Sequence, residues 1–208
     1  ASYEPCTPVE SPVCSGNPNH HIWGLPEKHM SETFMSPVAE VRWCKLMDPV
    51  AAYDPAKKEY TIDMVLDFNN EEHKAFIEKI EQHYLDEHGK NAKRSQHAIN
   101  LKADKENDAL SILKFKLPAF LDKKGNYTPG PTIMDAAKNP WGGAEIGNGS
   151  KMKIQYSIYA WGGSGGAGIT FQPHVCQVID FNEYTSQPKG DPSAFDPIPG
   201  GFVADEQE

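Results

Sequence analysis

The stretch 146-IGNGSKMKIQYSIYAWGGSGGAGITFQPHVCQVIDF-181 contains two strand-like segments joined by a glycine-rich turn. The apolar residues of the first segment are Met152, Ile154, Tyr156 and Ile158. They alternate with Lys151, Lys153, Gln155, Ser157, Tyr159 and Trp161. Side chains alternate across a strand, so the first set, with Tyr156, is predicted to face the core and the second set the solvent. Lysines pair with phosphates and flat rings stack on bases, so this solvent face has the ingredients of sequence-tolerant single-strand binding.

The rest of the sequence indicates further strands and one helix. Strands are expected over 38–46, 59–68 and 109–120, with a short one over 127–134, and the polar, basic segment 89–108 is expected to be a loop. In the first strand, alternation alone does not show which face is buried. Asn69 is expected to cap a helix that carries an apolar stripe and ends at Gly89. His73, His83 and His88 of this helix are expected on its surface.

This order of elements predicts an all-β (mainly β) fold with one inserted α-helix. The strand count fits an OB-fold-like barrel, the small five-stranded Greek-key barrel of the oligonucleotide-binding type. Periodicity alone leaves a jelly roll or a sandwich open. The glycine-rich segment 162–168 is not followed by the Gly-Lys-Ser/Thr of a phosphate-binding loop, and we interpret it as a mobile loop that folds over DNA.

Composition and charge divide the chain into three parts. Residues 1–37 are rich in Pro, Ser and Asn, which indicates an extended N-terminal arm; 38–181 is the expected domain, and 182–208 an acidic, disordered tail. The net charge is −9, but seven acidic residues and one lysine lie from Asp180 onwards. The near-neutral body is therefore compatible with a basic groove for which the tail competes. No secretory signal and no apolar run of membrane-spanning length is visible.

Cysteines and catalytic motifs give no sign of an enzyme. The four cysteines are scattered, and Cys6 and Cys14 with His20 and His21 match no usual zinc spacing, although a zinc cluster stays open beside free thiols. The motif His-Glu-x-x-His does not occur. We therefore expect a binding protein with no metal and no cofactor.

Three segments carry a family resemblance. The opening stretch, together with 112-ILKFKLPAFLDKKG-125 and 59-EYTIDMVLDFNNEEHKAFIEKI-80, resembles the single-stranded DNA-binding proteins of podovirus-type bacteriophages. The resemblance covers about 38–181 and implies an oligonucleotide-binding barrel that coats and protects single-stranded DNA during phage DNA replication and recombination. It further implies the cytoplasm of the infected bacterial host as location, a possible homodimer, and contacts of the acidic tail with a polymerase and a helicase–primase.

The candidate DNA-binding residues follow from the strand faces. They are Lys151, Lys153, Tyr159 and Trp161 in one strand, Lys114 and Lys116 in a neighbouring one, and Arg42, Trp43 and Phe120. Lys90, Lys93 and Arg94 form either a solvated surface or a phosphate-contacting loop.

A different class of function stays open. A β-sandwich carbohydrate-binding or interaction module would use exposed Trp43, Trp141 and Trp161 as its platform for sugar rings. Lysines beside the aromatic residues favour nucleic acid over a neutral sugar.

Overall fold

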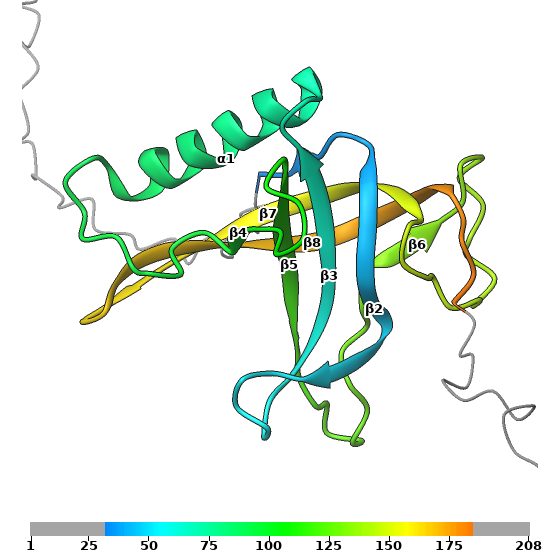
Figure 1. Ribbon diagram of the computed structural model, residues 1–208. Coiled ribbons are helices and arrows are strands. Elements are labelled where there is room, and N and C mark those ends of the chain that lie inside the picture. Colours follow the sequence, from blue (N-terminus) through cyan, green and yellow to red (C-terminus); the bar gives the residue numbers. More distant parts are fainter. Residues whose placement is uncertain (1–31, 185–208) are drawn as a thin grey trace, which may run out of the picture. The chain divides into compact units, whose positions relative to one another are not determined.

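Five long strands make up most of the regular backbone in the computed structural model, which describes residues 32–184 (Figure 1). The elements are β1 (Phe34–Met35), β2 (Ala39–Ala51), β3 (Lys58–Asp67), α1 (Glu71–His88), β4 (Leu101–Ala103), β5 (Leu110–Ala119), β6 (Thr132–Met134), β7 (Lys151–Gly163) and β8 (Gly166–Asp180). The expected mainly-β fold with a single inserted helix is confirmed for this part of the chain. Most of the expected arm, and the expected tail from residue 185, lie outside the described residues.

Backbone pairing closes the five long strands into a ring. The order is β2–β3–β5–β8–β7, and β7 pairs back to β2 through Ala39↔Met152 and Glu40↔Lys151. The β5–β8 pair is parallel at Phe115↔Phe171, and the other four pairs are antiparallel. This closed Greek-key order fits the expected barrel of the oligonucleotide-binding type and not the jelly roll or the sandwich. The short strands β1, β4 and β6 extend the sheet beside β7, β5 and β8.

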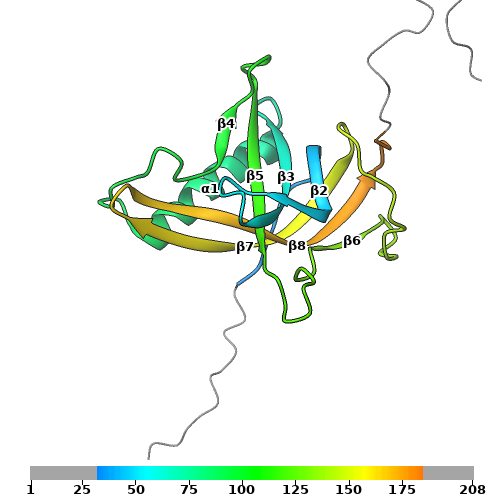
Figure 2. The ribbon, with the colours of Figure 1, turned by 90° about the horizontal axis from the view of Figure 1, so that it is seen from below.

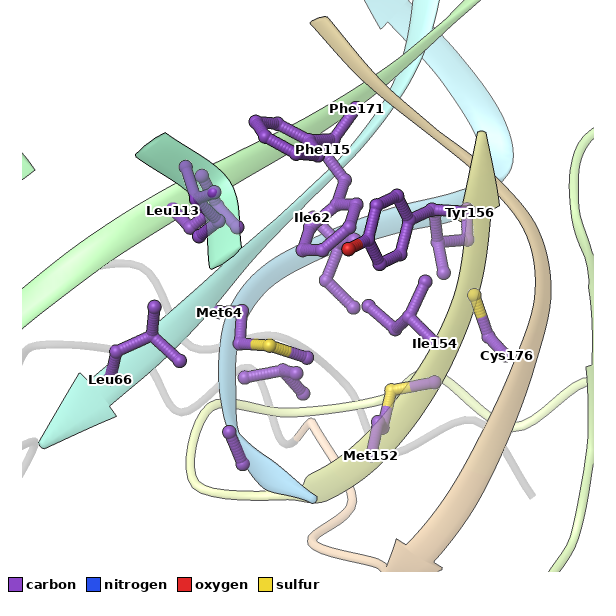
Figure 3. Packing of buried hydrophobic residues seen from close by; sticks show 14 of the residues in the cluster. Ile62, Met64, Leu66, Leu113, Phe115, Met152, Ile154, Tyr156, Phe171 and Cys176 are labelled. Atoms are coloured by element: carbon purple, nitrogen blue, oxygen red, sulfur yellow. The ribbon is translucent and has the colours of Figure 1, made fainter. Parts of the chain in front are cut away.

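The core fills the inside of this ring (Figure 3). Many of its largest fully buried side chains come from alternate positions of the strands: Ile62, Met64 and Leu66 in β3, Leu113 and Phe115 in β5, Met152, Ile154 and Tyr156 in β7, and Phe171 in β8. The Tyr156 ring is buried and meets the rings of Phe115 and Phe171 edge-on, at centroid distances of 5.6 and 5.5 Å. The predicted phase is therefore confirmed for 151–156. Ser157, predicted to face the solvent, is instead buried and lies 2.7 Å from His174 Nε2, after a shift in the β7–β8 register between Gln155 and Tyr156.

Helix α1 covers one end of the ring, above the strands in Figure 1 and behind them in Figure 2. Its cap is Asn70 and not Asn69, as the Asn70 side chain accepts the N–H groups of Glu72 and His73. The Asn69 N–H is instead bound by the Asp67 carboxylate at 2.8 Å, which makes the preceding turn.

Two histidines of α1 are buried, so their expected surface position is wrong. Steps of three, four and three residues lead from His73 through Phe76 and Ile80 to His83, which puts both histidines on the buried stripe. His73 Nδ1 accepts the Asp67 N–H at 3.0 Å, and its Nε2 lies 3.0 Å from the Val38 carbonyl. These contacts satisfy both ring nitrogens, which explains how an imidazole is tolerated there.

The tip of the β7–β8 hairpin is held and is not the mobile loop expected for 162–168. The two strands stay paired up to Gly163↔Gly166. The segment after α1 then binds β8: Ala167 exchanges hydrogen bonds with Lys93 and Ser95, at 2.8 and 3.0 Å. Gly166 has φ +119°, and a Cβ there would lie 2.7 Å from the Ser95 nitrogen, so only glycine fits this approach. The same 89–108 segment contains β4, where a loop was expected.

Between residues 32 and 184, no helix combines the length and the apolar character needed to cross a membrane.

Candidate nucleic-acid interface

Outward-facing side chains of the barrel line two hollows that adjoin at Lys116. The first is lined by residues that include Arg42, Trp43, Asp63, Lys102, Asp104, Lys105, Lys114, Lys116 and Asn148. The second is lined by residues that include Glu59, Lys116, Phe120, Tyr159, Thr170 and Gln172. We call the two hollows together the outer groove. Six of the nine candidate residues line it: Arg42, Trp43, Lys114, Lys116, Phe120 and Tyr159.

Two carboxylates of the neighbouring strand β3 already pair with the lysines of β5. Asp63 lies opposite Lys114 in the β3–β5 register, and Lys114 Nζ is 2.7 Å from Asp63 Oδ1. Lys116 Nζ is 3.4 Å from Glu59 Oε1. Both lysines remain partly exposed, so a phosphate can reach them but must compete with the carboxylate.

Arg42 is held more firmly. Its guanidinium donates to Glu40 Oε1 at 3.0 Å and to Asp104 Oδ2 at 2.8 Å, and these bonds raise the pKa of Arg42. Asp104 also accepts the backbone N–H groups of Glu106 and Asn107. These backbone bonds, the Glu106 bond first, and then the Arg42 contact lower the pKa of Asp104. Arg42 therefore also fixes the β4–β5 loop at the edge of the outer groove.

Two lysines that were not candidates in the sequence complete the cationic side of the groove. Lys102 in β4 and Lys105 in the β4–β5 loop are exposed and form no ion pair with any residue between 32 and 184. The signal that could have found them was the basic character of the 89–108 segment, which drew attention to Arg94 instead. Arg94 is structural: both of its terminal nitrogens bind the Glu81 carboxylate at 2.8 Å, and it lies 4.7 Å from the Tyr84 ring centroid.

Three aromatic side chains stand exposed along the groove. Trp43, Phe120 and Tyr159 are 63%, 66% and 57% exposed. Trp161 is half-buried: its indole nitrogen donates to Thr170 Oγ1 at 3.1 Å, and its ring packs on Gly168. A single strand lying in the groove would therefore meet Tyr159 before Trp161.

Lys151 and Lys153 do not line the groove. They lie at the start of β7, opposite Asp180 and Gln177 of β8, whereas Tyr159 is eight residues further along the strand. At about 3.3 Å per residue this separates Lys151 from Tyr159 by roughly 26 Å. The candidates of β7 therefore lie on two different surfaces of the barrel: Tyr159 lines the outer groove, and Lys151 and Lys153 lie away from it.

A β-bulge explains how Arg42 and Trp43, neighbours in the sequence, both reach the groove. Arg42 pairs with Asp63 and Lys45 with Thr61, so two residues of β2 oppose one residue of β3. Trp43 has φ +51°, a left-handed backbone that costs a bulky residue about 1–2 kcal/mol. Because of the bulge, the side chains of β2 do not alternate strictly between its two faces. This is why alternation alone did not show which face of the strand is buried.

Between residues 32 and 184, no three His, Cys, Asp or Glu side chains gather where they could hold a metal ion. Cys6, Cys14, His20 and His21 lie outside the described residues. Cys44 and Cys176 are free thiols, and burial raises the pKa of Cys44 to about 11.

Solved structures share this fold. No protein-family model and no curated protein matches the sequence. The crystal structure of gp2.5, a single-stranded DNA-binding protein encoded by bacteriophage T7, matches with a TM-score of 0.56 and 19% identity, over 84% of this chain and 100% of that chain. The fold is that of bacteriophage single-stranded DNA-binding proteins. It confirms, at the level of the fold, the resemblance carried by the three sequence segments.

A second phage protein gives the same result. The C-terminally truncated single-stranded DNA-binding protein from bacteriophage Enc34 matches with a TM-score of 0.58 and 12% identity, over 73% of this chain and 87% of that chain. The Enc34 protein in complex with single-stranded DNA matches with a TM-score of 0.53 and 10% identity, over 76% and 89%. At such identities the likeness lies in the backbone, and the groove must be judged on this chain's own side chains.

Proposed function

We propose that this protein binds single-stranded DNA, without sequence preference, along the outer groove. The observation that carries the proposal is the joint placement of three exposed rings and four lysines in one groove. The rings are Trp43, Phe120 and Tyr159, and the lysines are Lys102, Lys105, Lys114 and Lys116. The shared fold with phage single-stranded DNA-binding proteins supports it.

Binding of this kind is positional and electrostatic. The lysines pair with phosphates and release counterions, so the affinity falls as salt rises. Bases stack on the exposed rings, each stack contributing about 1–3 kcal/mol. Neither contact depends on the identity of the base, and the groove therefore predicts little sequence preference.

The biological role we propose follows from the sequence resemblance. The protein coats and protects single-stranded DNA during phage DNA replication and recombination, in the cytoplasm of the infected bacterial host. Its acidic C-terminal segment contacts replication proteins such as a polymerase and a helicase–primase, and the protein forms a homodimer. The concentration of acidic residues from Asp180 onwards supports the part given to this segment.

The test is fluorescence anisotropy of a labelled oligothymidine titrated with the full chain at several salt concentrations, with duplex DNA of equal length as the comparison. We expect tight, salt-sensitive binding to the single strand and weak binding to the duplex. Lys116→Ala should weaken binding and lower the slope of log affinity against log salt by less than one, because Lys116 already pairs with Glu59. Lys74→Ala is the matched control, because Lys74 pairs with Glu71 on α1 and lines neither hollow.

No binding at low salt, also after removal of residues 185–208, would overturn the proposal. The carbohydrate-binding alternative is less well supported by the structure. Of its three tryptophans only Trp43 is exposed, since Trp141 donates its indole N–H to Ala144 and packs on Phe181. We therefore put forward the DNA-binding function alone.

A further inference from the structure

Trp43 combines two features that rarely occur together in a strand. It is a bulky residue with a left-handed backbone, and its ring is exposed at the edge of the outer groove. In a bulge of this kind the left-handed position is normally filled by glycine, because a side chain there is strained. Strained residues persist only where the surroundings hold them, and they gather at ligand-binding sites.

Asn148 provides such a hold. Its side-chain oxygen accepts the Trp43 backbone N–H at 2.8 Å, across 105 positions of sequence. Asn148 lines the same hollow as Trp43, and also the neighbouring hollow formed with Lys45 and Tyr184. This hydrogen bond thus links the bulge of β2 to the loop before β7.

The loop that carries Asn148 is itself anchored on two sides. The Gly149 N–H donates to the Val41 carbonyl at 3.1 Å, which fixes the loop to β2 just before the bulge. On the other side, Asn182 Nδ2 donates to the Asn148 carbonyl at 2.7 Å, and the Gly147 N–H donates to the Asn182 carbonyl at 2.8 Å. The Asn148 side chain is therefore presented to Trp43 by a loop with little freedom to move.

We infer that Asn148 is a positioning residue for DNA binding: its bond to the Trp43 N–H holds the left-handed bulge that keeps the indole ring at the groove as a stacking surface. The inference rests on the proposed function. Without this acceptor, β2 can relax toward regular strand geometry, which turns the side chain of residue 43 to a different direction. A ring held in place before binding loses less conformational freedom when a base stacks on it, which favours affinity.

A double-mutant cycle tests this inference with the full chain. Oligothymidine affinity and the thermal midpoint are measured for the unmodified protein, Trp43→Ala, Asn148→Ala and the double variant. Loss of one stacked base should weaken binding about 5- to 150-fold in Trp43→Ala. Asn148→Ala should give a part of this loss and should add nothing in the Trp43→Ala background, because coupled residues are not additive. The salt slope should stay unchanged, since no phosphate contact is removed.

Two further variants separate positioning from folding. Asn148→Asp keeps the acceptor and should restore binding at high salt, where its added charge is screened. Asn139→Ala removes an exposed asparagine of another loop, which bonds only to Asp135, and should leave the affinity unchanged. Asn148→Ala can lower the thermal midpoint as well as the affinity. Asn148→Asp then separates the two effects, because it restores the affinity only if the side-chain acceptor for the Trp43 N–H is what matters.

The possible outcomes distinguish the inference from the proposed function. No binding by the unmodified protein overturns both. Binding that Trp43→Ala leaves unchanged overturns the stacking surface while the proposed function stands. Losses that add in the double variant show that Asn148 acts independently of Trp43, and they overturn the positioning role alone.

Discussion

At the scale of single residues, three of the five cations that line the outer groove are already paired with carboxylates, whereas Lys102 and Lys105 form no ion pair within residues 32–184. Lys114, Lys116 and Arg42 each lie within 3.4 Å of a carboxylate oxygen on a neighbouring strand or loop. A phosphate that binds one of them exchanges one ion pair for another and does not simply add a contact. The salt dependence of DNA binding is then expected to be shallower than the number of cations suggests.

Removal of one of these carboxylates should strengthen DNA binding. In Asp63→Asn the Lys114 ammonium loses its partner at 2.7 Å and becomes free for a phosphate. We expect oligothymidine affinity at low salt to rise about two- to fivefold, in line with the energy of a partly exposed ion pair. Glu71→Gln, which breaks the Lys74 pair on α1, should leave the affinity unchanged. Weaker binding by Asp63→Asn would mean that the carboxylate orients Lys114 for the DNA.

At the scale of elements, the β7–β8 hairpin depends on close contacts at its glycines. A Cβ at Gly168 would lie 2.3 Å from an atom of the Trp161 ring, and the adjoining Gly166 touches the segment after α1. Through Gly166 the hairpin contacts the segment after α1, and its own strand β7 carries Tyr159. The hairpin therefore joins the helix side of the barrel to the outer groove. This packing explains why a stretch rich in glycine forms a paired hairpin.

Gly168→Ala should destabilise the protein. The added methyl group must displace the Trp161 ring, and overpacking of this kind costs about 1–3 kcal/mol. We expect a lower midpoint in urea or thermal unfolding followed by circular dichroism. Gly163→Ala is the matched control in the same hairpin, because a Cβ there has no atom within 4 Å. Equal midpoints for the two variants would contradict the close packing.

Helix α1 should make the stability depend on pH through His83. The ring lies 4.4 Å from the Phe34 ring centroid and 3.4 Å from the Tyr156 hydroxyl oxygen. Burial, followed by the charge of Lys79, lowers the pKa of His83, although Asp86, Glu32 and Glu87 oppose this. The unfolded state then binds more protons at mildly acidic pH, so stability should fall as the pH drops below about 6.5.

The measurement is urea unfolding at pH 7.5 and pH 5.5. His83→Gln should remove part of the difference in the free energy of unfolding between the two conditions. His97→Gln changes an exposed histidine of the loop after α1 and should keep the full difference. An unchanged pH dependence in His83→Gln would assign the effect to other groups.

At the scale of the whole molecule, the charge of the chain is divided between the groove and the C-terminal segment. Tyr184 lies close to Lys45, whose Nζ is 5.9 Å from the ring centroid, and lines the same hollow as Trp43 and Asn148. Tyr184 therefore lies in a hollow that adjoins the outer groove at Trp43 and Asn148, and the chain continues from it into residues 185–208. This last segment carries five acidic residues and one lysine.

Removal of residues 185–208 should tighten oligothymidine binding at low salt, because an internal competitor for the lysines is lost. The gain should vanish at high salt, where the acidic residues are screened. Anisotropy titrations of the full and the shortened chain at the two salt concentrations measure both effects. Equal affinity of the two chains at low salt would count against the competition.

Local sequence patterns determined much of the fold. Alternation of apolar residues gave the positions of the long strands and the inward phase of Tyr156, and helical spacing gave the extent of α1 up to Gly89. Such patterns depend on neighbours within one element, so they can be read directly from the chain. They also placed Phe120 and Tyr159 on outward faces, which the structure confirms, but they left the face of Trp43 undecided and wrongly predicted that Trp161 is exposed.

Only the tertiary structure decided how these residues come together. The register of β3 on β5 sets Asp63 against Lys114, the length of β7 separates Lys151 from Tyr159, and a loop 105 positions away holds Trp43. Each of these depends on which strands become neighbours and in what register, and no local period encodes that. The sequence by itself determined the long strands, the helix and the outward faces of Phe120 and Tyr159. The closure of the barrel decided which cations lie beside those rings and which carboxylates compete for them, because both are contacts between distant parts of the chain.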